Sequence, residues 1–152
     1  AFVERGHAVV ASPHAPERPL DRLDEETDRS SDYRVLSPIA VPRFLPEIHE
    51  QVAEGDLVVE LLVESGAVEY LREYDRLDDA LDTDGFGLFR TDEPIEFGVL
   101  ACDDRETAAL FAYGPQGGVA GMFVSDDPAA YRWADRTYRR YREAAVPVEP
   151  LS

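Results

Sequence analysis

The chain has 152 residues, the usual length of one domain with a single hydrophobic core. It carries 32 acidic residues against 15 arginines and no lysine, which gives a formal net charge of −17. With 44% hydrophobic residues it is not a disordered tail, and its longest apolar run, residues 57–63, is too short to cross a membrane. We therefore expect a soluble globular domain with no signal peptide and no membrane partner.

The acid excess indicates adaptation to salt. At ordinary ionic strength so large a net charge destabilises the compact state, whereas molar salt shortens the Debye length to about 3 Å and removes most of the repulsion. A mimic of nucleic acid would show the same excess and stays open as an alternative. The single cysteine, Cys102, excludes an internal disulfide, a cysteine-based zinc cluster and a C-x-x-C redox pair. It favours a reducing compartment, and we predict a cytoplasmic protein.

The front part of the chain predicts alternating strands and helices. Residues 1–32 are expected to form an N-terminal strand and linker, and residues 33–148 the main domain. In this domain, strands at 33–39 and 57–63 are each followed by a helix, an order that predicts a parallel core. The apolar faces and closing glycines of these helices are Leu45, Ile48, Val52 and Gly55, then Tyr70, Tyr74, Leu77, Leu81 and Gly85.

The rear part predicts an antiparallel meander and a C-terminal helix. Its short strands are separated by turn signals and are expected at 87–90, 97–102, 107–113 and 119–124, with a hairpin turn at 114–118. In the last helix, Asp127 is a plausible N-cap, Pro128 occupies the first turn and Pro147 follows the end. Its inward stripe is Ala130, Trp133, Ala134, Thr137, Tyr138 and Tyr141. The predicted fold class is therefore α/β (α+β), with a parallel βαβα front half.

One sequence position favours ligand binding more than the others. Glu60 interrupts an apolar strand, so its carboxylate must be paired, hydrogen-bonded or placed at the mouth of a cavity. Glu64 and Ser65 end the same strand, at the edge where open α/β sheets bind ligands. The alternative is that Glu60 is a rim residue in water.

Other reactive residues lack the spacing that chemistry requires. His7, His14 and His49 form no metal-binding motif, so we expect packed or solvated histidines, no metal and no cofactor. Ser37 and Cys102 lack the setting of a nucleophile, and we expect no enzyme. The acidic pairs suit turns and caps, and the arginines of the last helix suit ion pairs, although those arginines could bind an anion or a partner. The pairs are Asp78-Asp79, Asp103-Asp104 and Asp126-Asp127, and the arginines are Arg132, Arg136, Arg139, Arg140 and Arg142.

Several short stretches carry a family resemblance. They are Tyr33-Arg34-Val35-Leu36-Ser37-Pro38, Pro42-Arg43-Phe44, Val58-Val59-Glu60-Leu61, Ile95-Glu96-Phe97-Gly98-Val99-Leu100, Ser125-Asp126-Asp127-Pro128 and Trp133-Ala134. Over about residues 9–148 the chain resembles the C-terminal effector domain of archaeal winged-helix transcriptional regulators of the methanogenesis-regulator class, which are abundant in halophilic archaea. The order of elements is also similar to the sensor domain of TrmB-type regulators, which looks like half of a phospholipase-D-type fold.

The resemblance implies a regulatory domain that binds a small-molecule effector, forms a homodimer, or both. DNA would be bound only by a winged helix that this chain does not include. A ligand pocket is implied near Ser37, Arg43, Glu64 and Phe97, with Glu60 added from the strand pattern. Phospholipase-D-type catalysts use an H-x-K motif, and the absence of lysine excludes that chemistry. The alternatives are a free-standing module that binds a small molecule or a protein, and a small hydrolase.

Overall fold

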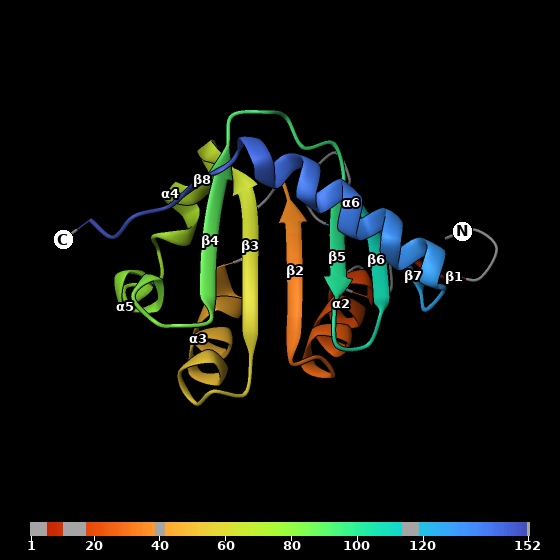
Figure 1. Ribbon diagram of the computed structural model, residues 1–152, viewed down its shortest axis with the longest axis horizontal. Helices are drawn as coiled ribbons and strands as arrows, with labels where there is room; N and C mark the ends of the chain where they lie inside the picture. The colour runs from red at the N-terminus through yellow and green to blue at the C-terminus, as the bar shows by residue number, and fades with distance from the viewer. Residues whose placement is uncertain (1–5, 11–17, 39–41, 114–118, 152) are drawn as a thin grey trace.

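An eight-stranded mixed sheet forms the centre of the molecule, in the strand order β1-β7-β6-β5-β2-β3-β4-β8. The computed structural model describes residues 6–10, 18–38, 42–113 and 119–151 (Figure 1). In chain order the elements are β1 (Gly6–Val10), α2 (Arg18–Asp28), β2 (Asp32–Ser37), η1 (Pro42–Phe44), α3 (Leu45–Ala53), β3 (Val58–Glu64), η2 (Ser65–Ala67), α4 (Val68–Leu71), α5 (Leu77–Leu81), β4 (Phe86–Thr91), β5 (Gly98–Cys102), β6 (Thr107–Tyr113), β7 (Val119–Ser125), α6 (Pro128–Ala144) and β8 (Val146–Pro147).

The parallel half of the sheet consists of β2, β3 and β4. Tyr33 of β2 lies opposite Val59 of β3, and Val59 lies opposite Phe86 of β4, with all three strands running in the same direction. The predicted parallel front half is confirmed. The assignment of β4 to the meander was wrong, because α4 and α5 carry the chain back along the sheet before β4 begins. A strand that follows such a crossover runs parallel to its predecessor.

The antiparallel half consists of β5, β6 and β7, as the meander prediction required. β5 joins the two halves, since it pairs antiparallel with β2, where Cys102 lies opposite Tyr33. β1 extends the sheet beyond β7, with Gly6 opposite Ser125. The hairpin turn expected at 114–118 lies outside the described residues.

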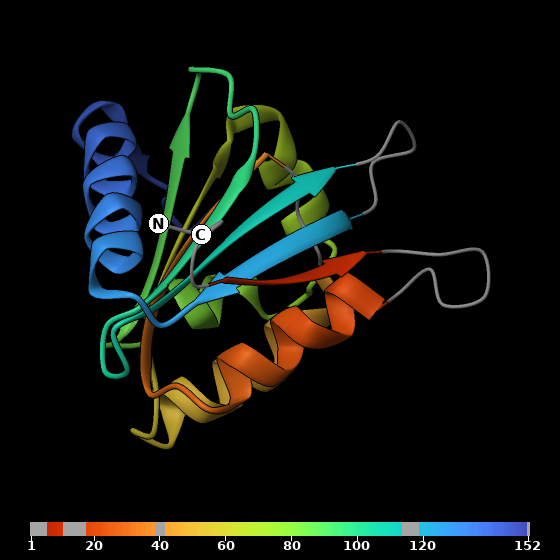
Figure 2. The same ribbon diagram turned by 90° about the vertical axis from the view of Figure 1, so that its right-hand side faces the viewer.

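Helices cover both faces of the sheet (Figure 2). α6 crosses one face, and α2, α3, α4 and α5 lie on the other. Alternate residues of each strand point to opposite faces, so that Tyr33 and Val59 belong to the core under α2 and α3, whereas Leu36 and Leu62 belong to the core under α6. The sheet therefore separates two cores, and a side chain's position along its strand decides which one it joins.

The single helix expected over residues 70–81 is replaced by two short helices, α4 and α5. Tyr70 is 62% exposed, whereas the neighbouring Leu71 and the later Leu77 are buried. Four of the five residues between the helices are charged, at 72, 73, 75 and 76, which suits a solvated turn better than one face of a packed helix. The prediction of a single helix from the spacing of tyrosines and leucines was therefore wrong.

α6 begins and ends as the sequence predicts. The Asp127 side chain accepts a hydrogen bond from the backbone N–H of Ala129 at 3.0 Å, and Pro128 is the first helical residue. The helix ends at Ala144, and Pro147 lies beyond it in β8. Within the expected inward stripe, four residues are buried and Trp133 and Thr137 are half-buried; the buried four are Ala130, Ala134, Tyr138 and Tyr141.

Replacing Asp127 with alanine is expected to lower the free energy of unfolding by about 1 kcal/mol, because a helix N–H group loses its acceptor. Asp127→Asn should lose much less, since the amide oxygen can accept the same bond. Urea denaturation followed by circular dichroism at constant salt would measure both. Equal losses for the two variants would show that the carboxylate acts through its charge and not as a cap.

Candidate functional site

A cavity of about 100 Å³ lies between the sheet and the layer formed by α2 and α3. Strands β2, β3 and β6 supply its apolar floor, because each directs alternate side chains toward this face. Helices α2 and α3 supply the opposite wall through Leu23, Leu45 and Ile48. The floor residues are Tyr33, Val35, Leu61, Val63 and Phe111. The sequence builds this space from three strands that are far apart in the chain.

Two hydroxyl groups interrupt the apolar lining. The oxygens of Ser37 and Tyr113 lie 2.7 Å apart, a hydrogen bond between β2 and β6. Ser37 is buried, and burial raises the pKa of Tyr113, so its phenol stays protonated at neutral pH. The pair places a polar group within the mainly apolar lining, and a few polar groups in an apolar site are the usual composition of a small-molecule site.

Three carboxylates lie where the cavity meets solvent. They come from Asp24 and Asp28 of α2 and Glu47 of α3, and their oxygens lie within 4.8 Å of one another. The negative charge of Asp28, followed by partial burial and the charge of Asp24, raises the pKa of Glu47. The spacing could hold a metal ion, but exposed acidic groups of this kind are common without one. The absence of a metal stays a prediction.

A second, polar groove lies on the opposite face, beside α6, and has a volume of about 370 Å³. At its centre, Arg34 donates to Asp103 at 3.0 and 2.7 Å and to Asp135 at 2.5 Å. Hydrogen bonds from Arg34 and Arg139 lower the pKa of Asp135 although its burial opposes this. Tyr131 also donates to Asp103. The two arginines that line this groove pair with Asp103 and Asp135, and its other two acidic residues, Asp32 and Glu60, leave the lining with more acids than bases.

Glu60 lies in the polar groove and is held by α6. It accepts a hydrogen bond from Tyr138 at 3.1 Å and lies 3.6 Å from Arg142. Its side chain is 38% exposed, so Glu60 is paired and hydrogen-bonded, as one expectation required, and it also lies at the rim of the groove, as the alternative held. These contacts explain the position of Glu60 without a ligand.

The expected binding residues do not form one site. Ser37 lines the apolar cavity, whereas Glu60 and Glu64 point to the α6 face of the sheet. Glu64 accepts a hydrogen bond from the backbone N–H of Ile95 at 3.0 Å, and the ring of Phe97 stacks on Trp133 with centroids 6.0 Å apart. Neither Glu64 nor Phe97 lines the apolar cavity or the polar groove. The side chain of Arg43 lies outside the described residues.

Most of the other reactive side chains have structural partners. His49 is buried, with Nδ1 2.7 Å from the Tyr74 hydroxyl, which confirms a packed histidine. Burial raises the pKa of Cys102 to about 11, so its thiol is not a nucleophile at neutral pH. The side chains of His7 and His14 lie outside the described residues.

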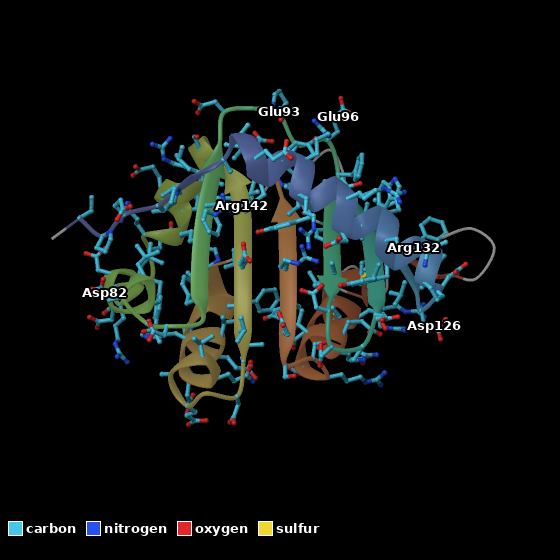
Figure 3. The ribbon with its side chains drawn as sticks, in the orientation of Figure 1. Asp82, Glu93, Glu96, Asp126, Arg132 and Arg142 are labelled. Carbon is cyan, nitrogen blue, oxygen red and sulfur yellow. The ribbon has the colours of Figure 1, made fainter. Side chains whose placement is uncertain are left out.

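Several arginines of α6 form structural ion pairs, and Figure 3 labels two of the helix's arginines, Arg132 and Arg142. Arg139 pairs with Asp135 at 3.0 Å, as the i, i+4 spacing predicted, and Arg140 pairs with Glu93 at 3.0 Å. Arg142 lies over the ring of Phe89 as well as beside Glu60. Arg132 projects into solvent near the start of the helix. For three of the five arginines, the ion-pair interpretation is therefore confirmed.

The carboxylates at the cavity mouth were not anticipated. A sequence signal existed, because Asp24 and Asp28 are four residues apart and so share one face of a helix with Leu23. In a chain with 32 acidic residues, that spacing alone could not distinguish a site from a solvated surface.

The helices in the described part of the chain include none with the length and apolar character of a membrane span.

The chain has a phospholipase-D-like α/β fold, as its similarity to three solved structures shows. TrmBL2, described as an archaeal chromatin protein with a novel mode of DNA binding, has a TM-score of 0.73 and 15% identity over 96% of this chain. NucT from Helicobacter pylori has a TM-score of 0.72 and 12% identity, and Nuc from Salmonella typhimurium, a phospholipase D family member, 0.70 and 11%. Each of the latter two similarities covers 95% of this chain and 99% of the other.

The sequence profile of the middle domain of the methanogenesis regulatory protein FilR1 matches residues 16–144. The chain belongs to this family, which confirms the resemblance to regulators of the methanogenesis class. No curated protein sequence matches the chain. It spans 55% of the length of TrmBL2.

Proposed function

We propose that the domain is the regulatory part of a DNA-binding regulator. It binds a small-molecule effector in the cavity between α2, α3 and the strands β2, β3 and β6. The observation that carries this proposal is the mainly apolar cavity with the hydrogen-bonded hydroxyls of Ser37 and Tyr113 in its lining. The regulator would act in the cytoplasm as a homodimer. Its DNA affinity would come from a separate winged helix, because a domain with a net charge of −17 is repelled by DNA phosphates.

The location of the cavity would allow a bound ligand to change how α2 packs on the sheet. Its walls belong to two layers, since α2 and α3 lie on one side and the sheet on the other. α2 also contacts the edge strand β1 and its neighbour β7. A ligand that contacts both layers would favour one position of α2 relative to the sheet, and so shift a pre-existing equilibrium. Catalysis by the H-x-K mechanism needs a lysine, and the sequence contains none.

Replacing Val63 with phenylalanine is expected to fill the cavity and abolish effector binding. Val63 is 5% exposed and lines the floor, so the larger ring must occupy space that a ligand would use. The unmodified chain would first be screened against amines, organic acids, sugars and nucleotides by thermal shift. A true effector raises the melting temperature in proportion to the logarithm of its concentration, and Val63→Phe should remove that rise.

Val58→Phe is the matched control, because Val58 lies on the same strand but is 51% exposed on the other face. It should leave the thermal shift unchanged, and circular dichroism would show that both variants are folded. If no compound shifts the melting temperature, or if a hit acts equally on Val63→Phe, effector binding in this cavity is wrong. Sedimentation analysis would then test whether the domain serves only to dimerise the regulator.

A further inference from the structure

The charges around the cavity all have one sign among the described lining residues. Asp24, Asp28 and Glu47 stand at its mouth, and none of the lining residues whose side chains the structure describes is basic. The described charged groups that raise the pKa of Glu47 are Asp28, Asp24 and Glu50. The polar groove on the opposite face differs, because two arginines, Arg34 and Arg139, line it and pair with its carboxylates Asp103 and Asp135.

We propose that the cavity selects a small organic cation, with an apolar body among the floor residues and an ammonium group between the carboxylates at the mouth. This inference rests on the proposed function, since it names the chemical class of the effector. The apolar walls of Val35, Leu61 and Val63 favour a ring or a short alkyl chain over a hydrated metal ion. A volume of about 100 Å³ restricts that body to a single ring or a similar size.

The carboxylates discriminate between ligand charges in two ways. A cation relieves the mutual repulsion of Asp24, Asp28 and Glu47, whereas an anion of the same shape adds to it. A neutral alcohol gains the apolar contacts alone. The Ser37 and Tyr113 hydroxyls can serve a second polar group on the ligand, but they carry no charge that would attract an anion.

Three probes with the same ring separate charge from shape: benzylamine, benzyl alcohol and benzoate. Calorimetric titration of the 152-residue chain, at a salt concentration where it is folded, should show benzylamine binding about tenfold more tightly than benzyl alcohol. Benzoate should give no detectable binding. Val63→Phe should remove the binding of benzylamine and benzyl alcohol alike, because it fills the space that both rings need.

A double variant tests the role of the mouth. Asp28→Asn with Glu47→Gln should weaken benzylamine about tenfold and leave benzyl alcohol unchanged, since two attractive charges are lost and the cavity is retained. Asp82→Asn with Asp84→Asn removes the same net charge from an exposed turn that does not line the cavity. This control should leave the binding of both probes unchanged.

Each outcome decides between the two proposals. If benzyl alcohol or benzoate binds as tightly as benzylamine, the cation preference is wrong and effector binding stands. If the Asp82 and Asp84 control weakens benzylamine as much as the Asp28 and Glu47 variant, the whole acidic surface attracts the cation and the inference is again wrong. If a compound of another class binds and Val63→Phe abolishes its binding, the proposal of a cationic ligand is wrong and effector binding in the cavity stands. If nothing binds, both proposals fail.

Discussion

Arg34→Met is expected to lower the free energy of unfolding by about 3 kcal/mol. The Arg34 side chain is 10% exposed and joins β2 to Asp103 of the β5–β6 turn and Asp135 of α6. It also lies over the Tyr138 ring, 5.0 Å from its centroid. Without it, Asp103 loses its cation and Asp135 keeps only its exposed ion pair with Arg139. This expected loss of unfolding free energy is near the lower end of the range for broken buried ion pairs, because both carboxylates are about one quarter exposed.

Arg139→Met is the matched control for Arg34→Met. Arg139 contacts the same carboxylate, Asp135, at 3.0 Å, but its side chain is 71% exposed. Its removal should cost less than about 1 kcal/mol, as for other surface ion pairs. Urea is the suitable denaturant, because it is uncharged and leaves the ionic strength constant. Equal effects of the two substitutions would show that net charge, and not the buried geometry, sets the stability.

Gly98→Ala is expected to destabilise the domain by about 2–3 kcal/mol through overpacking. Gly98 of β5 lies opposite Phe111 of β6, and a Cβ atom at this position would stand 1.9 Å from Cε2 of the ring. The ring is 2% exposed and packs edge-on against Tyr113, so it has little space to move. Because Phe111 also forms part of the cavity floor, ligand affinity should fall with stability.

Gly66→Ala provides the control for Gly98→Ala. A Cβ atom at Gly66 would have no neighbour within 4 Å, so its effect should stay within about 0.5 kcal/mol. Urea denaturation would measure stability, and calorimetry would measure ligand binding by both variants. A Gly98→Ala domain as stable as the original would contradict the close contact between β5 and the ring.

The elements that the sequence predicted well are those whose signals are local. α6 has a capping aspartate, a proline in its first turn and a continuous inward stripe, and all of these act within one helix. β4 was misplaced because its partner was decided by the crossover before it and not by its own residues. The prediction of one helix over residues 70–81 was wrong for a related reason. Charged residues between Leu71 and Leu77 interrupt a spacing of apolar residues that otherwise suits one helix.

The candidate site was less predictable because its walls come from both layers. Ser37 was named only through the family resemblance, and its partner, Tyr113, lies 76 residues later on β6. Glu64 was grouped with Ser37 by the same resemblance, and Glu60 was added from the strand pattern. The pleat places Ser37 on one face and the two glutamates on the other, a difference that depends on the phase of each strand.

The pairing of β1 with β7 has a consequence for synthesis on the ribosome. Gly6 is translated well before its partner, Ser125, which is added only after β2 to β6 have been made. Until then the backbone N–H and C=O groups of β1 have no partner strand, and α2 lacks one of the two strands that it contacts, β7. The nascent chain must therefore hold β1 unpaired until β7 is made, which leaves this segment exposed to chaperones and to pairing with another chain.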